Sequence, residues 1–176
     1  NSTIYIETEV KNSDINSKNF SIYSVIRDMD GREIVRTEPT SPTNIMAKEI
    51  IKIKQQCNIK NPHLWSCDDP FLYCVETIIK ENEIVKDSYF TTIGVREARF
   101  DKEKGFILNG KQVKLKGVNV HQDHAGVGSA IPNALQEYRI DRLKSFGCNA
   151  YRASHNPMTP SLLDICDRKG MLVIDE

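Results

Sequence analysis

Residues 149–176, NAYRASHNPMTPSLLDICDRKGMLVIDE, decide the fold of the second half of the chain, because two strand-like runs flank one helix. Asn149 to Ser154 is predicted to be a strand. Thr159 and Pro160 then predict a helix start, with threonine as the N-cap and proline at the first helical position. The apolar stripe of this helix consists of Leu162, Leu163, Ile165 and Cys166. Gly170 ends the helix, and the apolar run 171–174 is typical of a strand buried on both faces of a parallel sheet.

The preceding segment repeats this order of strand and helix. Val113 to His121 is predicted to be a strand, followed by an irregular loop to Pro132. A helix is predicted from Ala134 to Phe146, with Asn133 and Gln136 as a loose capping pair and Gly147 as its stop. Its apolar stripe is predicted to be Leu135, Tyr138, Ile140, Leu143 and Phe146. The order βαβαβ is typical of a doubly wound sheet or of the opening of a (β/α)₈ barrel.

Residues 3–92 have a different pattern, in which short runs alternate apolar and polar residues and turn signals separate the runs. Predicted strands cover residues 3–10, 20–27, 49–54, 71–79 and 83–90. Asp30-Gly31 predicts a tight hairpin, because glycine accepts the positive φ that such turns require. Six or seven short strands without a helix predict a small immunoglobulin-like β-sandwich. We therefore expect an all-β sandwich at residues 1–96 and a partial α/β unit at residues 97–176.

Composition excludes several classes of partner. The chain has 24 Lys and Arg against 24 Asp and Glu, without a run of five like charges, so neither a nucleic-acid face nor a membrane-binding patch is expected. No apolar stretch approaches the roughly 20 residues that span a bilayer. The first residues lack the charged-then-apolar order of a signal peptide, so an exported protein would carry its signal outside this sequence.

The five cysteines predict free thiols rather than a disulfide framework. They are odd in number and contain no Cys-x-x-Cys pair, which also argues against a thiolate zinc site. Buried free thiols are the favoured interpretation. One bridge among Cys57, Cys67 and Cys74 stays open, so cysteine usage does not identify the cellular compartment.

Each predicted parallel strand ends in polar residues, and ligand-facing residues of parallel α/β folds lie at those carboxyl ends. The candidates are Asn119 and His121, then Arg152 to His155, then Asp175 and Glu176. Strict alternation would place Arg152 and His155 on opposite faces of the strand. The strand must therefore break near Ser154 if both residues serve one pocket, and Asn156-Pro157 supports such a turn.

The basic candidates also have structural alternatives. His121 could bind a metal with Asp123 and His124, but their irregular spacing and the lack of a fourth ligand argue against a metal site. A sugar-contacting imidazole is the preferred interpretation. A loop histidine satisfied by backbone or water is the plain alternative. Arg152 occupies a strand position that should be buried, where an unpaired guanidinium is costly, so it should have a carboxylate or a ligand as partner.

Glu176 could be a catalytic carboxylate, since it ends a predicted strand. Glycoside hydrolysis, however, requires two carboxyl groups about 5 to 10 Å apart, and Asp175 would point to the other face. The segment Gly126-x-Gly128 lacks the strand and helix context of a nucleotide site. As a lone acid, Glu176 does not indicate catalysis.

Five stretches of the sequence resemble glycoside hydrolase family 2, the group of β-galactosidases, β-glucuronidases and β-mannosidases. Residues 62–73, PHLWSCDDPFLY, resemble its Pro-x-Leu-Trp-Ser stretch at the close of an immunoglobulin-like domain. Residues 94–97, GVRE, leading into 106–111, FILNGK, and 116–121, KGVNVH, resemble the start of its catalytic barrel. Residues 149–157, NAYRASHNP, resemble its Asn-x-x-Arg-x-Ser-His-Tyr-Pro signature, with Asn156 in place of the tyrosine.

The resemblance implies a retaining exo-acting β-glycosidase, with a β-galactosidase as the first expectation, that works through a covalent glycosyl-enzyme intermediate. It implies that Arg152 lies near the family's nucleophile and that His121 and His155 contact the sugar. Asn119, at a predicted strand end, completes the substrate-binding candidates. The loop from His121 to Gly128 is closer to bacterial β-galactosidase-like members than to β-glucuronidases.

The same resemblance implies that the family's jelly-roll domain and both catalytic glutamates lie outside these residues. We therefore expect a fragment of a longer enzyme that is inactive alone, with no catalytic residue, metal ligand or cofactor site. A divalent cation in the parent enzyme has no support in this sequence. Deprived of the nucleophile, Arg152 is expected to turn to solvent or to another acid such as Glu176.

The expected partner is the carbohydrate substrate of the parent enzyme. A partial barrel also leaves open strand edges, which predicts self-association. The alternative function is a non-catalytic carbohydrate-binding or interaction module. Trp65 beside Phe71 and Tyr73 could then be a sugar-stacking patch, although core packing is the favoured role for this cluster.

Overall fold

The computed structural model describes all residues from Asn1 to Glu176 and is mostly β, with two helices. It divides into two compact units. The first comprises residues 1–62 and 73–93, and the second comprises residues 63–72 and 94–176. The segment 63–72 therefore interrupts the first unit in sequence while belonging to the second. Neither helix is long and apolar enough to cross a lipid bilayer.

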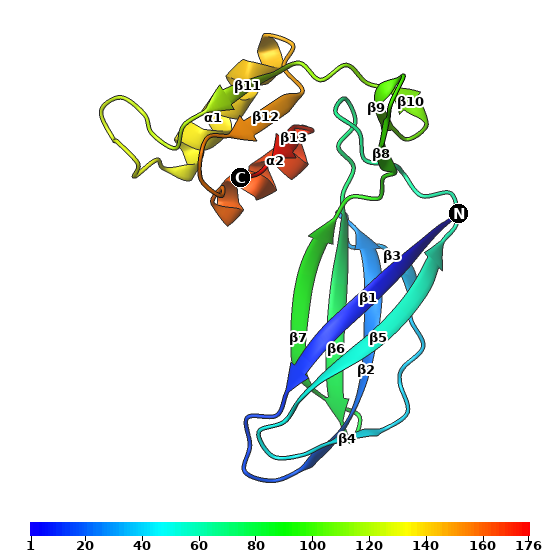
Figure 1. Cartoon of the computed structure of the whole chain (residues 1–176). Coiled ribbons are helices and arrows are strands. Elements are labelled where there is room, and N and C mark those ends of the chain that lie inside the picture. The colour runs from blue at the N-terminus through cyan, green and yellow to red at the C-terminus, as the bar shows by residue number, and fades with distance from the viewer. The chain divides into compact units, whose positions relative to one another are not determined.

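The first unit contains seven strands in two antiparallel sheets. In one sheet β1 (Ser2–Lys11) pairs with β5 (Ile50–Ile59). The other has the order β3 (Glu33–Arg36), β2 (Lys18–Asp28), β6 (Tyr73–Glu81), β7 (Ile84–Ile93), and β4 (Thr43–Ile45) also pairs with β2. Figure 1 shows β1 and β5 crossing one face of the larger sheet. The strand content confirms the prediction that this part of the chain is all β.

Apolar side chains from both sheets form the core of the first unit. The buried cluster contains Val10, Phe20, Ile22 and Ile45, with Ile51, Ile53 and Ile79 packed against it. Exposure alternates along β1 and β5, as expected for strands with one buried face. The predicted hairpin at Asp30-Gly31 is also confirmed, since β2 pairs with β3 across it and Gly31 has φ of +85°.

The second unit begins with a small antiparallel sheet that the sequence analysis did not predict. It has the order β10 (Lys111–Gln112), β9 (Gly105–Leu108), β8 (Ala98–Asp101). Asn109 and Gly110, between β9 and β10, both have positive φ, at 51° and 77°. Asn-Gly between two apolar runs is a strong hairpin signal, so this turn was readable from the sequence.

The rest of the second unit is a three-stranded parallel sheet with two helices. It has the order β11 (Gly117–Val120), β12 (Ala150–Ala153), β13 (Leu172–Ile174). The helix α1 (Asn133–Ser145) connects β11 to β12, and α2 (Pro160–Lys169) connects β12 to β13 (Figure 1). This confirms the predicted βαβαβ order, although β11 begins later than the predicted Val113. The prediction that residues 171–174 are buried on both faces is wrong for Ile174. This residue is 50% exposed at the end of an edge strand.

The predicted details of α1 are partly wrong. Its N-cap is Pro132 without a side-chain cap, and Gln136 instead donates a hydrogen bond to the carbonyl of Ile131 (3.2 Å). Tyr138 and Phe146, predicted in the apolar stripe, are 58% and 77% exposed. The face that packs inward carries positions 136, 140 and 143, at i, i+4 and i+7 spacing, so the two aromatic residues lie off it. In α2 proline is at the start as predicted, but Thr159 makes no capping hydrogen bond.

Two clusters form the core of the second unit. One joins Ile140 of α1 to Tyr151 of β12 and to the apolar stripe of α2, Leu162, Ile165 and Cys166. The other surrounds Trp65 and includes Leu72, Leu108, Ala150 and Leu172. Trp65 is 2% exposed, and its indole Nε1 donates to the carbonyl of Asp167 (2.8 Å). Core packing of Trp65 is therefore confirmed, and its indole is not available for sugar stacking.

All five cysteines are free, as predicted. Cys57, Cys67 and Cys166 are buried, whereas Cys74 and Cys148 are partly exposed. Burial raises the pKa of the Cys166 thiol to about 12, because the thiolate would lose its hydration. Cys166 therefore packs in the core beside Ile140 and Tyr151 and is not a reactive nucleophile.

Candidate functional site

Polar side chains from three parallel strands meet at the carboxyl ends of β11, β12 and β13. Asn119 of β11 lies opposite Arg152 of β12, and its Oδ1 accepts a hydrogen bond from Arg152 Nη1 (3.4 Å). Arg152 Nη2 forms an ion pair with Glu176 Oε1, and His155 Nδ1 lies 2.7 Å from Glu176 Oε2. One carboxylate therefore holds both basic side chains, which confirms that Arg152 has an acidic partner and turns to Glu176.

The strand break after β12 makes this arrangement possible. The strand ends at Ala153, and the Ser154 N–H donates to the Val120 carbonyl (3.1 Å). Arg152 and His155 would point to opposite faces of a continuous strand, yet both contact Glu176. The predicted break at Ser154 is therefore confirmed.

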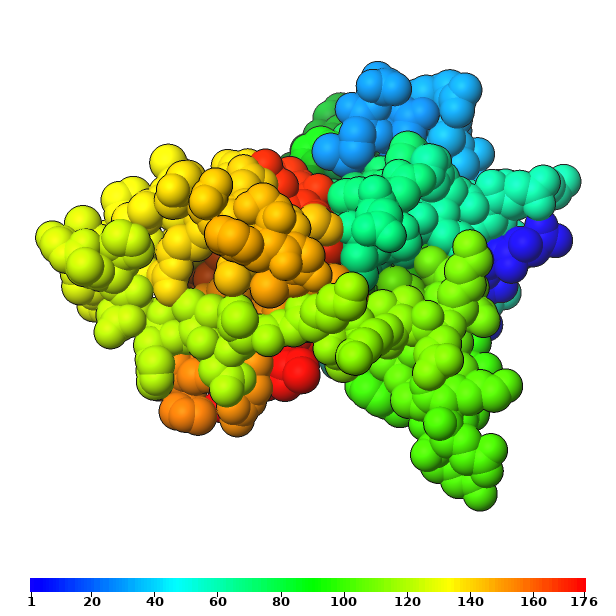
Figure 2. All heavy atoms as spheres, turned by 90° about the horizontal axis from the view of Figure 1, so that it is seen from above, coloured from blue at the N-terminus to red at the C-terminus, as the bar shows by residue number.

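The site lies at the surface. Arg152 is 37% exposed, Glu176 29% and His155 65%. Figure 2 shows the red carboxyl-terminal residues at the surface, beside orange residues of the segment that follows β12. Arg152 is therefore not in a desolvated pocket, and the groups around Glu176 are open to a solute.

The contacts of Glu176 favour its ionised form. The hydrogen bond from His155, together with the hydrogen bond and charge of Arg152, lowers the pKa of the Glu176 carboxyl, although partial burial opposes the shift. A carboxylate that is ionised at neutral pH accepts hydrogen bonds and orients cations, but it does not donate a proton. Glu176 therefore acts in this site as the anchor of Arg152 and His155.

His121 also joins the site. Its ring lies edge-on to the ring of His155, with 5.8 Å between centroids and an interplanar angle of 79°. Asp123 and His124, which a metal site with His121 would need, make other contacts. His124 Nδ1 contacts the carbonyl of the next residue, Ala125 (2.9 Å), and the Asp123 carbonyl accepts a hydrogen bond from Arg139 Nη1 (3.2 Å).

Asp175 points away from the site, as strand alternation predicts. Its Oδ1 accepts a hydrogen bond from the Met158 N–H (3.0 Å), whereas Glu176 contacts Arg152 and His155. The two adjacent acids thus serve different structures. Asp175 cannot supply the second carboxyl group that a glycosidase pair requires beside Glu176.

Two residues that the sequence analysis did not single out connect the loops of the site. Gln122 Nε2 donates to the carbonyls of Asn156 (3.0 Å) and Pro157, and Arg139 of α1 donates to the carbonyls of His121 and Asp123. No sequence signal identifies them, because their partners are backbone carbonyls. A cavity of about 30 Å³ beneath this loop is lined in part by Gln122 and Arg139. It is far smaller than the roughly 300 to 1,000 Å³ of ordinary ligand pockets, so the open surface is the candidate site.

Comparison with known families gives two matches that together cover most of the chain. Residues 1–96 match the family model described as glycosyl hydrolases family 2. Residues 101–176 match the model described as glycosyl hydrolases family 2, TIM barrel domain.

Among individual proteins, a β-galactosidase named BoGH2A from Bacteroides ovatus is 41% identical over 96% of this chain and 20% of its own length. A β-glucuronidase from Formosa agariphila is 31% identical over 97% of this chain and 17% of its own. A crystal structure of a glycosyl hydrolase family 2 member from Bacteroides cellulosilyticus has a TM-score of 0.91 at 34% identity, covering 99% of this chain and 24% of that one. The chain thus spans about a fifth of the length of the curated relatives it matches.

Proposed function

Because the chain belongs to glycosyl hydrolase family 2, we propose that it contributes part of the substrate-binding surface of an exo-acting β-glycosidase. In this proposal residues 1–96 are the immunoglobulin-like domain of the enzyme. Residues 97–176 provide the first three strands and two helices of its (β/α)₈ barrel. The parallel order of β11, β12 and β13, with a helix in each connection, supports this assignment.

The proposed substrate-binding residues are Asn119, His121, Arg152 and His155. The observation that carries the proposal is the convergence of Arg152 and His155 on Glu176 at the carboxyl ends of parallel strands, where barrel enzymes bind their ligands. Amide and imidazole groups can donate to and accept from sugar hydroxyls, and a guanidinium can donate to them. Glu176 orients the two basic side chains toward such a ligand.

The proposed substrate is a terminal β-linked galactoside. BoGH2A, which is 41% identical over 96% of this chain, is named a β-galactosidase, whereas a relative that is 31% identical over 97% of this chain is named a β-glucuronidase. The parent reaction would retain configuration through a covalent glycosyl-enzyme intermediate. We expect residues 1–176 alone to be inactive, because Glu176 is engaged by two basic groups and Asp175 points elsewhere, so the required pair of carboxyl groups is not assembled here.

A direct test compares turnover and binding. Residues 1–176 are incubated with chromogenic β-galactoside and β-glucuronide, and no release above the blank is expected. D-galactose, titrated into the same protein, is expected to shift the ring resonances of His121 and His155 more than D-glucuronate does. Turnover by this chain would contradict the inactivity proposal, and equal, unsaturable responses to both sugars would contradict the site.

A further inference from the structure

Arg139, on α1, makes two contacts to the loop after β11 that the proposed substrate binding does not use. Its Nη1 donates to the Asp123 carbonyl (3.2 Å) and its Nη2 to the His121 carbonyl (3.3 Å). Arg139 is only partly exposed and forms no ion pair with any acid of the chain. The planar guanidinium thus spans two carbonyls that belong to the loop of a candidate site residue.

Gln122 lies between those two carbonyls and points in another direction. Its Nε2 donates to the carbonyls of Asn156 and Pro157, in the loop that follows β12. The side chain therefore ties the loop after β11 to the loop that carries His155. Residues 121–123 are held on one side by α1 and on the other by the neighbouring strand-end loop.

The two loops joined by these contacts carry two imidazole rings that lie against each other. The rings of His121 and His155 approach edge-on at 5.8 Å, and His155 is itself anchored on Glu176. The hydrogen bonds farther along the loop after His121 are local ones, such as His124 N–H to the Gly128 carbonyl (3.0 Å). Without Arg139 and Gln122, little besides β11 would hold the His121 ring in place.

We infer that Arg139 and Gln122 are positioning residues that hold His121 against His155 for binding the sugar. The identity of the ligand rests on the proposed function, whereas the contacts that hold His121 and His155 are independent of it. A residue that holds a ligand-binding side chain in place can affect binding strongly, because a displacement of about 1 Å can cost about a hundredfold in activity. Neither residue need touch the sugar, so the effect of changing them passes through the imidazole rings.

The test uses residues 1–176 and the ¹H–¹³C spectra of the histidine rings. The chain has four histidines, and His63, which contacts Asp69 rather than this loop, serves as the internal reference. Arg139→Gln and Gln122→Met are expected to shift the ring signals of His121 and His155. Arg142→Gln is the matched control, because it removes one positive charge from the same helix where Arg142 lies over the Phe146 ring (5.4 Å). Arg139→Lys should restore the signals only in part, since an ammonium lacks the planar fork.

Binding of D-galactose provides the second measurement. Loss of two hydrogen bonds to carbonyls is expected to weaken it about tenfold in Arg139→Gln, with little change in Arg142→Gln. Thermal unfolding of each variant separates misfolding from displacement, and Gln122→Met tests the same rings if Arg139→Gln does not fold. Ring signals of His121 and His155 that superimpose on those of the unmodified chain in folded variants of both residues would overturn the inference.

The two proposals fail in different ways. If the unmodified chain binds neither D-galactose nor D-glucuronate, yet Arg139→Gln moves both ring signals, the positioning contacts stand and the sugar site is wrong. If galactose shifts His121 and His155 equally in the unmodified chain and in both variants, the sugar site stands and the positioning role is wrong.

Discussion

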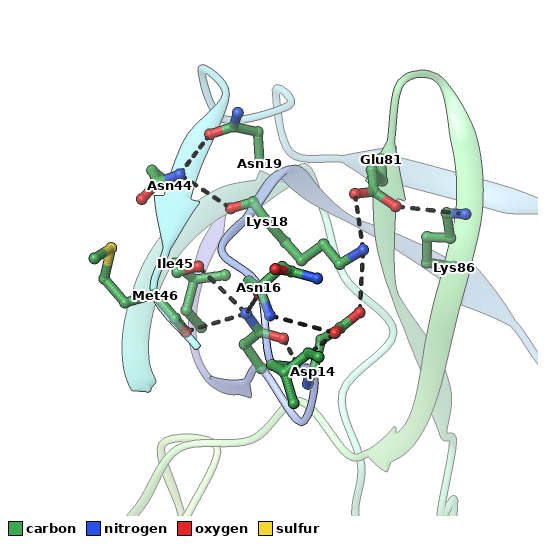
Figure 3. A network of polar contacts seen from close by, with 11 residues as sticks. Asp14, Asn16, Lys18, Asn19, Asn44, Ile45, Met46, Glu81 and Lys86 are labelled. Atoms are coloured by element: carbon green, nitrogen blue, oxygen red, sulfur yellow. Dashed lines mark hydrogen bonds and ion pairs between the residues drawn. The ribbon is translucent and has the colours of Figure 1, made fainter. Parts of the chain in front are cut away.

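Two polar networks in this chain have similar chemistry but different surroundings. In the first unit, Asn12 is 7% exposed, and its Nδ2 donates to the carbonyls of Asn16 (2.9 Å) and Met46 (3.1 Å). Nearby, Lys18 lies between Asp14 and Glu81, as Figure 3 shows. In the second unit, Arg152 and His155 each contact Glu176 through their side chains, and all three remain partly exposed.

The difference is one of partners and burial. Asn12 is paired with backbone carbonyls, which cannot leave without moving the chain, so its network stabilises a loop. Arg152 and His155 are paired instead with side chains, those of Glu176 and Asn119, which can rotate and which water can replace. Buried amide networks are therefore expected to matter for stability, and the exposed charged cluster for ligand binding.

The largest stability effect is expected for Asn12→Ala. The change removes the donor to the carbonyls of Asn16, Met46 and Ile45, and the bond to Ile45 (3.3 Å) is buried, so we expect a loss of about 2 kcal/mol in the free energy of unfolding. Urea unfolding followed by circular dichroism measures it. Asn44→Ala is the control, because Asn44 is exposed and its Nδ2 bonds the side chain of Asn19 (3.0 Å). Equal losses in the two variants would remove the distinction between the networks.

A substitution in the exposed cluster should have the opposite profile. Arg152→Met is expected to weaken D-galactose binding at least about tenfold, since it removes a charged donor, while the unfolding midpoint changes little. Arg168→Gln, an exposed arginine on α2, is the control for loss of charge. A large loss of stability with unchanged sugar binding would make Arg152 a structural residue.

The pH dependence of the cluster has a defined sign. The pKa of Glu176 is lowered below its ordinary value of 4.5, first by the His155 hydrogen bond and then by Arg152. A carboxyl whose folded pKa is depressed stabilises the fold above its unfolded pKa, and this contribution is lost as pH falls through the folded pKa. His155→Ala should therefore raise the pKa of Glu176. Carboxyl ¹³C titration measures this pKa. An unchanged value in the variant would show that His155 does not lower the pKa of Glu176.

The smallest effect is expected at the sheet edges. β11 and β13 are the two edge strands of the parallel sheet, with Val118 36% exposed and Ile174 50% exposed. We expect weak self-association that Val118→Lys reduces, because a lysine on an edge strand opposes pairing. Sedimentation velocity over a range of concentrations tests this. A monomer at every concentration would argue that the edges are inert.

Much of this fold follows from sequence periodicity. The alternation in β1 and β5 and the glycine at position 31 predict the first unit, since these signals depend on neighbours in the chain. The predicted apolar stripe of α1 is wrong at Tyr138 and Phe146. Both residues fit the helical spacing, but the helix packs against the core through Ile140 and they lie off that face. Which face a helix buries depends on tertiary neighbours that local spacing does not reveal.

Some residues of the candidate site are predictable from the sequence and others are not. Arg152, His155 and Glu176 are predictable, because polar residues at the ends of parallel strands converge on one edge of the sheet. Arg139 and Gln122 are not, because they bind the carbonyls of residues such as His121 and Asn156. Every residue has a carbonyl, so a side chain that binds one leaves no pattern in the sequence.

The segment 63–72 affects how such a protein could be rearranged by recombination. The chain passes between the two units three times, after residues 62, 72 and 93. A polypeptide that began at residue 97 would lack Trp65, whose indole packs beside Leu108, Ala150 and Leu172. A gene segment encoding only the parallel strands would thus encode an incomplete core. A single cut in the chain therefore cannot separate the two complete units, because residues 63–72 of the second unit lie within the sequence of the first.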